Sequence, residues 1–108
     1  MKLWRPFARD KRKQFWAGLC TARADGTNDS YRSGTKHALL TMVCATEPEV
    51  ESKIIMLLAA SGWREPVITN LKLLTGPFET EDRDIQACFK AADDGPGGII
   101  VYSDEIDS

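Results

Sequence analysis

The sequence is poor in the residues that most often build catalytic and metal sites. Its 108 residues include one histidine, His37, and three widely spaced cysteines, Cys20, Cys44 and Cys88. A metal site needs clustered His, Cys or carboxylate ligands, and the sequence has no C-x-x-C pair and no second histidine. Any Ser-His or Cys-His mechanism would have to use His37. We therefore predict no enzyme activity, no metal and no cofactor, with three buried thiols and an exposed histidine at a loop edge.

Long apolar runs are also missing. The longest one, IIMLLAA, covers residues 54–60, whereas a helix that spans a bilayer needs about 20 apolar residues. The basic start lacks the apolar stretch of a secretory signal. An odd number of scattered cysteines is typical of a reducing compartment. These features predict a cytoplasmic protein that does not cross a membrane.

Charge is abundant but unevenly divided along the chain. Residues 1–36 hold nine Lys or Arg and three acids, a balance of +6, while residues 37–108 hold five and thirteen, a balance of −8. This division is hidden in the net charge of −2. Such an asymmetry indicates interaction surfaces rather than a particular fold.

The first 13 residues form a basic segment that also carries aromatic side chains. MKLWRPFARDKRK contains six Lys or Arg and a single acid, Asp10. Cations and aromatic rings of this kind can contact phosphates and stack on bases. However, the acidic remainder of the chain would repel a polyanion within a Debye length of about 8 Å, and no nucleic-acid-binding motif is present. We interpret residues 1–13 as a solvated segment, with a protein-docking arm as the main alternative, ahead of a nucleic-acid or membrane contact.

The first half of the chain predicts two strands and a helix. Apolar residues 15–22 and 38–45 read as strands joined by a long exposed loop rich in Gly, Asn, Asp and Ser. Thr46 and Glu49 have the spacing of a capping box at a helix start, and Gly62 has the position of a left-handed helix end. The helix face expected to be buried comprises Val50, Ile54, Leu57, Leu58 and Ser61.

The second half predicts a strand, a helix and a strand. WREP at 63–66 reads as a helix stop and linker, and residues 67–75 as the next strand. A helix over 81–92, with Thr80 as its cap, follows from the spacing of Ile85, Cys88, Phe89 and Ala92. GIIVYS then reads as an inner strand, before an acidic tail at 104–108.

This order, β-β-α-β-α-β, predicts a single α+β domain over residues 1–108. The economical arrangement is a four-stranded mixed sheet with two helices packed on one face. Right-handed crossovers around each helix would make the last three strands parallel to one another, unless a hairpin lies within residues 67–78.

The acidic side chains of the second half are the candidate partner-binding residues. An acidic surface speeds the encounter with a basic target and fixes the register of docking, although acids in a first helical turn are also favoured by the helix dipole. The Trp63–Arg64 pair has the composition of an interface anchor. The acidic candidates are Glu79, Glu81, Asp82, Asp84, Asp93, Asp94, Asp104 and Glu105.

By elimination, the sequence favours a protein-binding module. Its concrete form is an immunity or antitoxin-type protein that neutralises a bacterial toxin, such as a nuclease, by masking a basic surface. One alternative is a small-molecule-binding domain or small enzyme that uses His37 and the 25–36 loop. Another is a structural subunit or homo-oligomer joined through a sheet face or edge.

Overall fold

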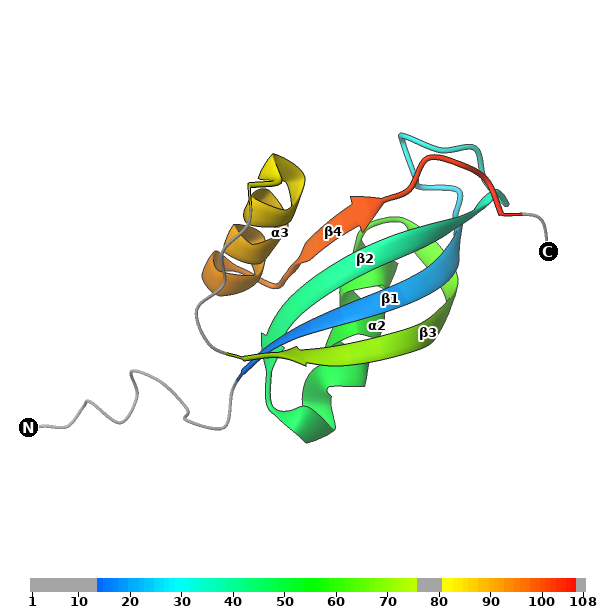
Figure 1. Cartoon of the computed structure of the whole chain (residues 1–108). Helices are drawn as coiled ribbons and strands as arrows, with labels where there is room; N and C mark the ends of the chain where they lie inside the picture. Colours follow the sequence, from blue (N-terminus) through cyan, green and yellow to red (C-terminus); the bar gives the residue numbers. More distant parts are fainter. Residues whose placement is uncertain (1–13, 76–80, 107–108) are drawn as a thin grey trace, which may run out of the picture.

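A computed structural model describes residues 14–75 and 81–106 of the chain (Figure 1). Its elements are β1 (Gln14–Ala24), β2 (Lys36–Ala45), the 3-10 helix η1 (Glu47–Glu49), α2 (Val50–Ala60), β3 (Trp63–Leu74), α3 (Arg83–Asp94) and β4 (Gly98–Val101). The predicted solvated segment 1–13 lies outside the described residues. The α+β class, with four strands and two helices in the predicted order, is confirmed.

The four strands form one antiparallel sheet in the order β3-β1-β2-β4. The prediction of a mixed sheet is therefore wrong. The chain does leave β2 through α2 and return in β3 in the same direction as β2, as a crossover requires, but β1 lies between these two strands. The run at 98–101 is an edge strand, because it pairs only with β2; it was expected to be an inner strand.

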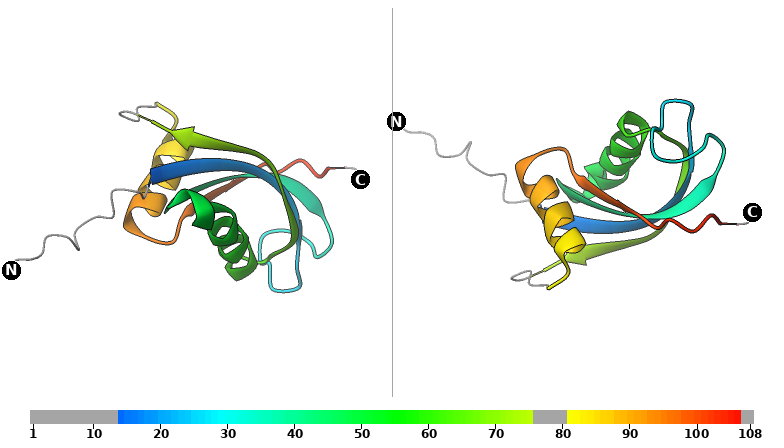
Figure 2. Two further views of the ribbon diagram at one scale, coloured as in Figure 1. Left: turned by 90° about the horizontal axis from the view of Figure 1, so that it is seen from below. Right: turned by 90° about the horizontal axis from the view of Figure 1, so that it is seen from above.

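The two helices pack against opposite faces of the sheet, not against one face as predicted. Trp16 and Val43 belong to the core cluster that contains Ile54 and Leu58 of α2. Their sequence neighbours Phe15 and Met42 pack instead with Cys88 and Phe89 of α3. Successive side chains of a strand point to opposite faces, which separates the two clusters. Figure 2 shows the curved sheet wrapping around α2, with α3 at one end.

The start of α2 differs from a capping box. The Thr46 hydroxyl donates to the Glu49 carboxylate at 2.8 Å, while the Glu49 amide bonds to the Thr46 carbonyl oxygen at 2.9 Å. This three-residue spacing makes the first turn a 3-10 helix, and no side chain caps it. The helix itself ends as predicted, because Gly62 has a φ of +91°.

WREP is the beginning of β3 rather than a linker. Trp63 is 4% exposed and belongs to the same core cluster as Ile54 and Leu58 of α2. The chain therefore turns at Gly62 and enters the sheet at once, so that the indole closes the end of the main core.

The cap of α3 is Asp82, not Thr80, which lies outside the described residues. The Asp82 Oδ1 accepts hydrogen bonds from the amides of Asp84 at 2.9 Å and Ile85 at 3.1 Å. An aspartate at this position satisfies amides that have no partner within the helix. Among the acidic residues at the start of α3, Asp82 therefore has a structural role.

Candidate functional site

Among the described residues, α3 covers only part of its face of the sheet. The helix packs over Phe15, whose ring lies 4.5 Å from that of Phe89, and over Met42. Farther along the same face, Leu19, Val67 and Tyr102 are 40%, 56% and 48% exposed. We call these three residues the open patch. They come from β1, from its neighbour β3, and from the residue after β4, which is separated from β1 by β2.

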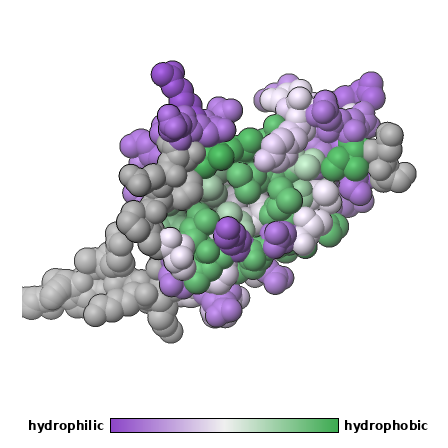
Figure 3. Space-filling view, in the orientation of Figure 1, coloured by the Kyte–Doolittle hydropathy of each residue, from purple (hydrophilic) through white to green (hydrophobic). Residues whose placement is uncertain are grey.

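The sheet register places the open patch on one continuous surface. Leu19 pairs with Leu40, and Thr21 pairs with Val67 on one side and Ala38 on the other. The amide of Tyr102 donates to the Ala38 carbonyl oxygen at 3.0 Å, which continues this row across the sheet. Figure 3 shows this face, with hydrophobic side chains gathered in its middle and hydrophilic ones at its borders. An apolar area with a polar rim is the usual composition of a protein interface.

The sequence contains a signal for the open patch in the composition of β1. Residues 15–22 of β1 are apolar at both odd and even positions, so that both faces of the strand are apolar. One face is covered by α2. Among the described residues, the other face is covered where α3 lies, and Leu19 is beyond the helix.

The acidic candidates fall into three exposed groups. Glu79 lies outside the described residues. Glu81, Asp82 and Asp84 lie at the start of α3, Asp93 and Asp94 at its end, and Asp104 and Glu105 after β4. The helix separates Asp84 from Asp93 by roughly 14 Å, at 1.5 Å per residue. Asp94 also pairs with Lys90 at 3.4 Å, so the acids of α3 act as two groups rather than one field.

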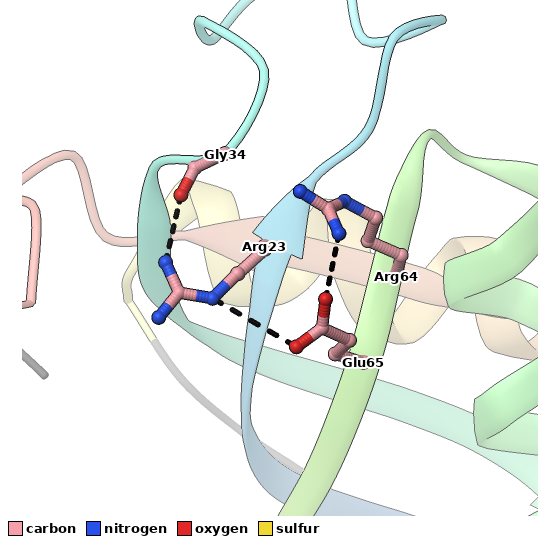
Figure 4. A network of polar contacts seen from close by, with 4 residues as sticks. All are labelled: Arg23, Gly34, Arg64 and Glu65. Carbon is pink, nitrogen blue, oxygen red and sulfur yellow. Dashed lines mark hydrogen bonds and ion pairs between the residues drawn. The ribbon is translucent and has the colours of Figure 1, made fainter.

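Trp63 and Arg64 have different environments and do not form an exposed anchor. Trp63 is buried, so its indole is not accessible to a partner. Arg64 is exposed and donates to the Glu65 carboxylate at 2.6 Å. Figure 4 shows that Arg23 lies on the other side of this carboxylate, 3.9 Å away, and donates to the Gly34 carbonyl oxygen at 2.8 Å.

Glu65 itself has an unusual backbone conformation. Its φ is +54°, and it lies in the part of β3 where the register with β1 shifts between Thr21 and Arg23. This is a β-bulge with a non-glycine residue in the left-handed region. The two arginines hold the Glu65 side chain at this bend.

His37 is buried, not exposed as predicted. The ring is 3% exposed and its Nδ1 donates to the Tyr102 carbonyl oxygen at 3.1 Å. Nε2 lies 3.1 Å from Thr35 Oγ1, and the ring packs against Tyr31 in a tilted arrangement, with 4.4 Å between the ring centroids. Both nitrogens and one ring face are therefore occupied by contacts that join the 25–36 loop, β2 and the tail.

The cysteines are not placed for nucleophilic chemistry with His37. Cys20 pairs with Leu39, and its Sγ lies 3.8 Å from Thr41 Oγ1. Burial raises the pKa of the Cys20 thiol, and it raises the pKa of Cys88 to about 11, so that both remain protonated near neutral pH. Within residues 14–75 and 81–106, no group of three His, Cys, Asp or Glu side chains is arranged to hold a metal ion.

Comparison with protein-family models, curated protein sequences and solved structures finds no match for this chain. In the part of the chain that the structure describes, no helix is long and apolar enough to cross a membrane. The geometry of the open patch and its surroundings is therefore the basis for a functional conclusion.

Proposed function

We propose that this protein is a cytoplasmic protein-binding module that docks its partner on the open patch. The observation that carries this proposal is the exposure of Leu19, Val67 and Tyr102 on one sheet face. Exposed apolar side chains are ordinary when they are scattered, but a group that spans several strands and has a polar border indicates a binding surface. Tyr102 also supplies the rigid aromatic ring that is enriched at interface centres.

The acidic groups give the partner its chemical character. The carboxylates at the start of α3 and in the tail attract a basic surface over longer distances than apolar contacts do. In its concrete form, the proposal is an immunity or antitoxin-type protein that masks the basic surface of a toxin. The open patch then supplies the contact area that becomes buried, and the acidic groups attract and orient the basic partner before contact.

The enzyme alternative has less support. Its one histidine is enclosed by Tyr31, Thr35 and Tyr102, and general acid-base catalysis needs a group within reach of a substrate. A homo-oligomer would use the same open patch, so we treat it as an outcome of the test.

A two-hybrid screen with a counter-selection tests this function. The full chain is used as bait, and each interactor is re-tested against the double variant Leu19→Lys/Val67→Lys. Met56→Lys serves as the matched control, because Met56 is 70% exposed on α2, on the other face of the sheet. Two buried charges in an interface are strongly unfavourable, so we expect the double variant to lose partners that the control retains.

Two outcomes contradict the proposal. One is that every partner binds the double variant and Met56→Lys equally. The other is that sedimentation shows a wild-type dimer that the double variant converts to monomer, which would assign the open patch to a second copy of this chain.

A further inference from the structure

The outer edge of β4 presents free backbone groups. The Tyr102 amide donates to the Ala38 carbonyl oxygen, and the same register pairs Ile100 with Leu40. In an antiparallel pair, alternate residues direct both N–H and C=O toward the partner strand. The intervening residues, Ile99 and Val101, therefore direct theirs away from β2. Among the described residues no strand pairs with this edge, since β4 ends the sheet order.

A groove runs along this edge. Its volume is about 490 Å³, and its floor is formed by residues 98–101. One wall is α3 and the other is the loop at Ser30 and Tyr31. At Gly98 the helix touches the strand, since a Cβ there would clash with the carbonyl oxygen of Cys88. Figure 1 shows α3 and β4 diverging from this contact, which leaves the edge accessible toward Val101.

The charge of the groove is negative. Among the described residues that line it, Asp84 is the one charged residue, and none of the described Lys or Arg side chains forms an ion pair with it. Glu81 and Asp82 belong to the same end of α3. An unpaired carboxylate beside a free strand edge favours a cationic side chain on whatever pairs with that edge.

We propose that the β4 edge binds an extended segment of the partner protein as a fifth strand, with a Lys or Arg of that segment directed at Asp84. This inference rests on the proposed function as a protein-binding module and names the chemistry of part of its partner. Strand addition draws affinity from backbone hydrogen bonds and specificity from alternate side chains. Ile99 and Val101 supply the bonds, and Asp84 selects a basic segment over an acidic one.

A random twelve-residue peptide library displayed on phage provides the probe. It is selected on the immobilised full chain, and enriched peptides are synthesised for affinity measurements. We expect sequences with β-branched residues, Lys or Arg, and no central Pro. Asp84→Asn is expected to weaken binding several-fold at low salt and less at high salt. Asp93→Asn, at the far end of α3, is the matched control and is expected to leave binding unchanged.

Removal of a single backbone donor gives the sharpest test. Cys88 is a natural ligation junction, so residues 88–108 can be joined as a synthetic peptide that carries N-methyl-Val101. The side chain and the bonds to β2 are kept, and only the outward N–H is lost. We expect an affinity about tenfold lower than that of the ligated, unmodified protein, since an unmet buried hydrogen bond has that effect.

Amide hydrogen exchange checks the same bonds without chemical modification. The Ile99 and Val101 amides are expected to exchange fast in the free protein and slowly with peptide bound, while Ile100 is protected in both states. Three results overturn the inference: no enriched peptide, no protection of these amides on binding, or a dimer whose formation protects them. Failure of the proposed function is distinguishable, because Leu19→Lys/Val67→Lys removes the protein partner without changing the β4 edge.

Discussion

The imidazole of His37 in β2 holds the backbone just after β4, because its Nδ1 donates to the Tyr102 carbonyl oxygen at 3.1 Å. Tyr102 is also a residue of the open patch. The ring of His37 lies on the α2 side of the sheet, beside Trp63 of the core. From there it positions Tyr102, which we propose contacts the partner.

Replacement of His37 by Ala is expected to lower the free energy of unfolding by about 3 kcal/mol. The change empties a buried ring site and leaves the Tyr102 carbonyl oxygen without its donor. Urea denaturation measures the effect, with Met56→Ala as an exposed control that should stay within about 0.5 kcal/mol. A loss below about 1 kcal/mol for His37→Ala, which is the size of one surface contact, would contradict the structural role of the ring.

The bulge at Glu65 predicts an unusual gain in stability. Glu65→Gly removes the strain of a left-handed backbone conformation, which is unfavourable by about 1 to 2 kcal/mol for a residue with a Cβ. The same change also loses two exposed ion pairs, which contribute little to stability. Glu65→Ala is the matched control, because it loses the same ion pairs and keeps the strain. Thermal unfolding should therefore place the Gly variant above the wild type and the Ala variant slightly below it. The reverse order would mean that the arginine contacts outweigh the strain.

The two helix starts should respond differently to loss of their side chains. Asp82→Ala removes a cap that accepts from two amides, and we expect a loss of about 1 kcal/mol. Thr46→Ala removes only a contact with the Glu49 carboxylate and should have a smaller effect. Ile54→Ala, at a fully buried position, is the reference variant and is expected to lower the free energy of unfolding by about 2 to 5 kcal/mol. If denaturation midpoints showed Thr46→Ala to be more destabilising than Asp82→Ala, this would show that a side-chain cap does form at α2.

The contact between β1 and α2 at Gly18 is tight enough for a double-mutant cycle. A Cβ at this position would lie 2.8 Å from Ile54 Cδ1 and 3.0 Å from Thr41 Oγ1. Gly18→Ala is therefore expected to destabilise the protein by about 1 to 3 kcal/mol. Ile54→Val removes the clashing methyl group, so the double variant should be more stable than the sum of the single changes predicts. Simple additivity would mean that the sheet, not Ile54, absorbs the added methyl group.

Thiol labelling tests the burial of the cysteines. Cys20 and Cys88 are buried with raised pKa values, whereas Cys44 is only half-buried. Iodoacetamide reacts with the thiolate, so at pH 8 we expect Cys44 to be modified well before the other two in the folded protein. Peptide mapping over time measures the order, and labelling in urea should remove the differences. Rapid labelling of Cys88 in the folded state would contradict the packing of α3.

The sequence predicted what depends on neighbouring residues and failed where distant segments meet. The limits of α2 follow from local signals, namely helical spacing and Gly62. The sheet order does not, because an apolar run such as GIIVYS reads the same at an edge and in the interior. Trp63 and His37 were misplaced for a related reason: their burial depends on contacts with Tyr31, which belongs to a loop whose polar composition suggested exposure.

The open patch was missed because the apolar residues of β1 alone do not reveal where α3 ends. Packing against α3 covers Phe15 and leaves Leu19 uncovered, and this division depends on the position of the helix along the sheet. The acidic candidates were found from composition, but their separation into groups follows from the length of α3.

The two edges of the sheet differ in their tendency to aggregate. β3 has two register shifts against β1 and carries Pro66, which has no N–H to donate. Interruptions of this kind prevent another chain from extending a sheet indefinitely. Because growth of a fibril needs two competent edges on every molecule, the irregular β3 edge would stop any accidental stacking that begins at β4 after a single addition.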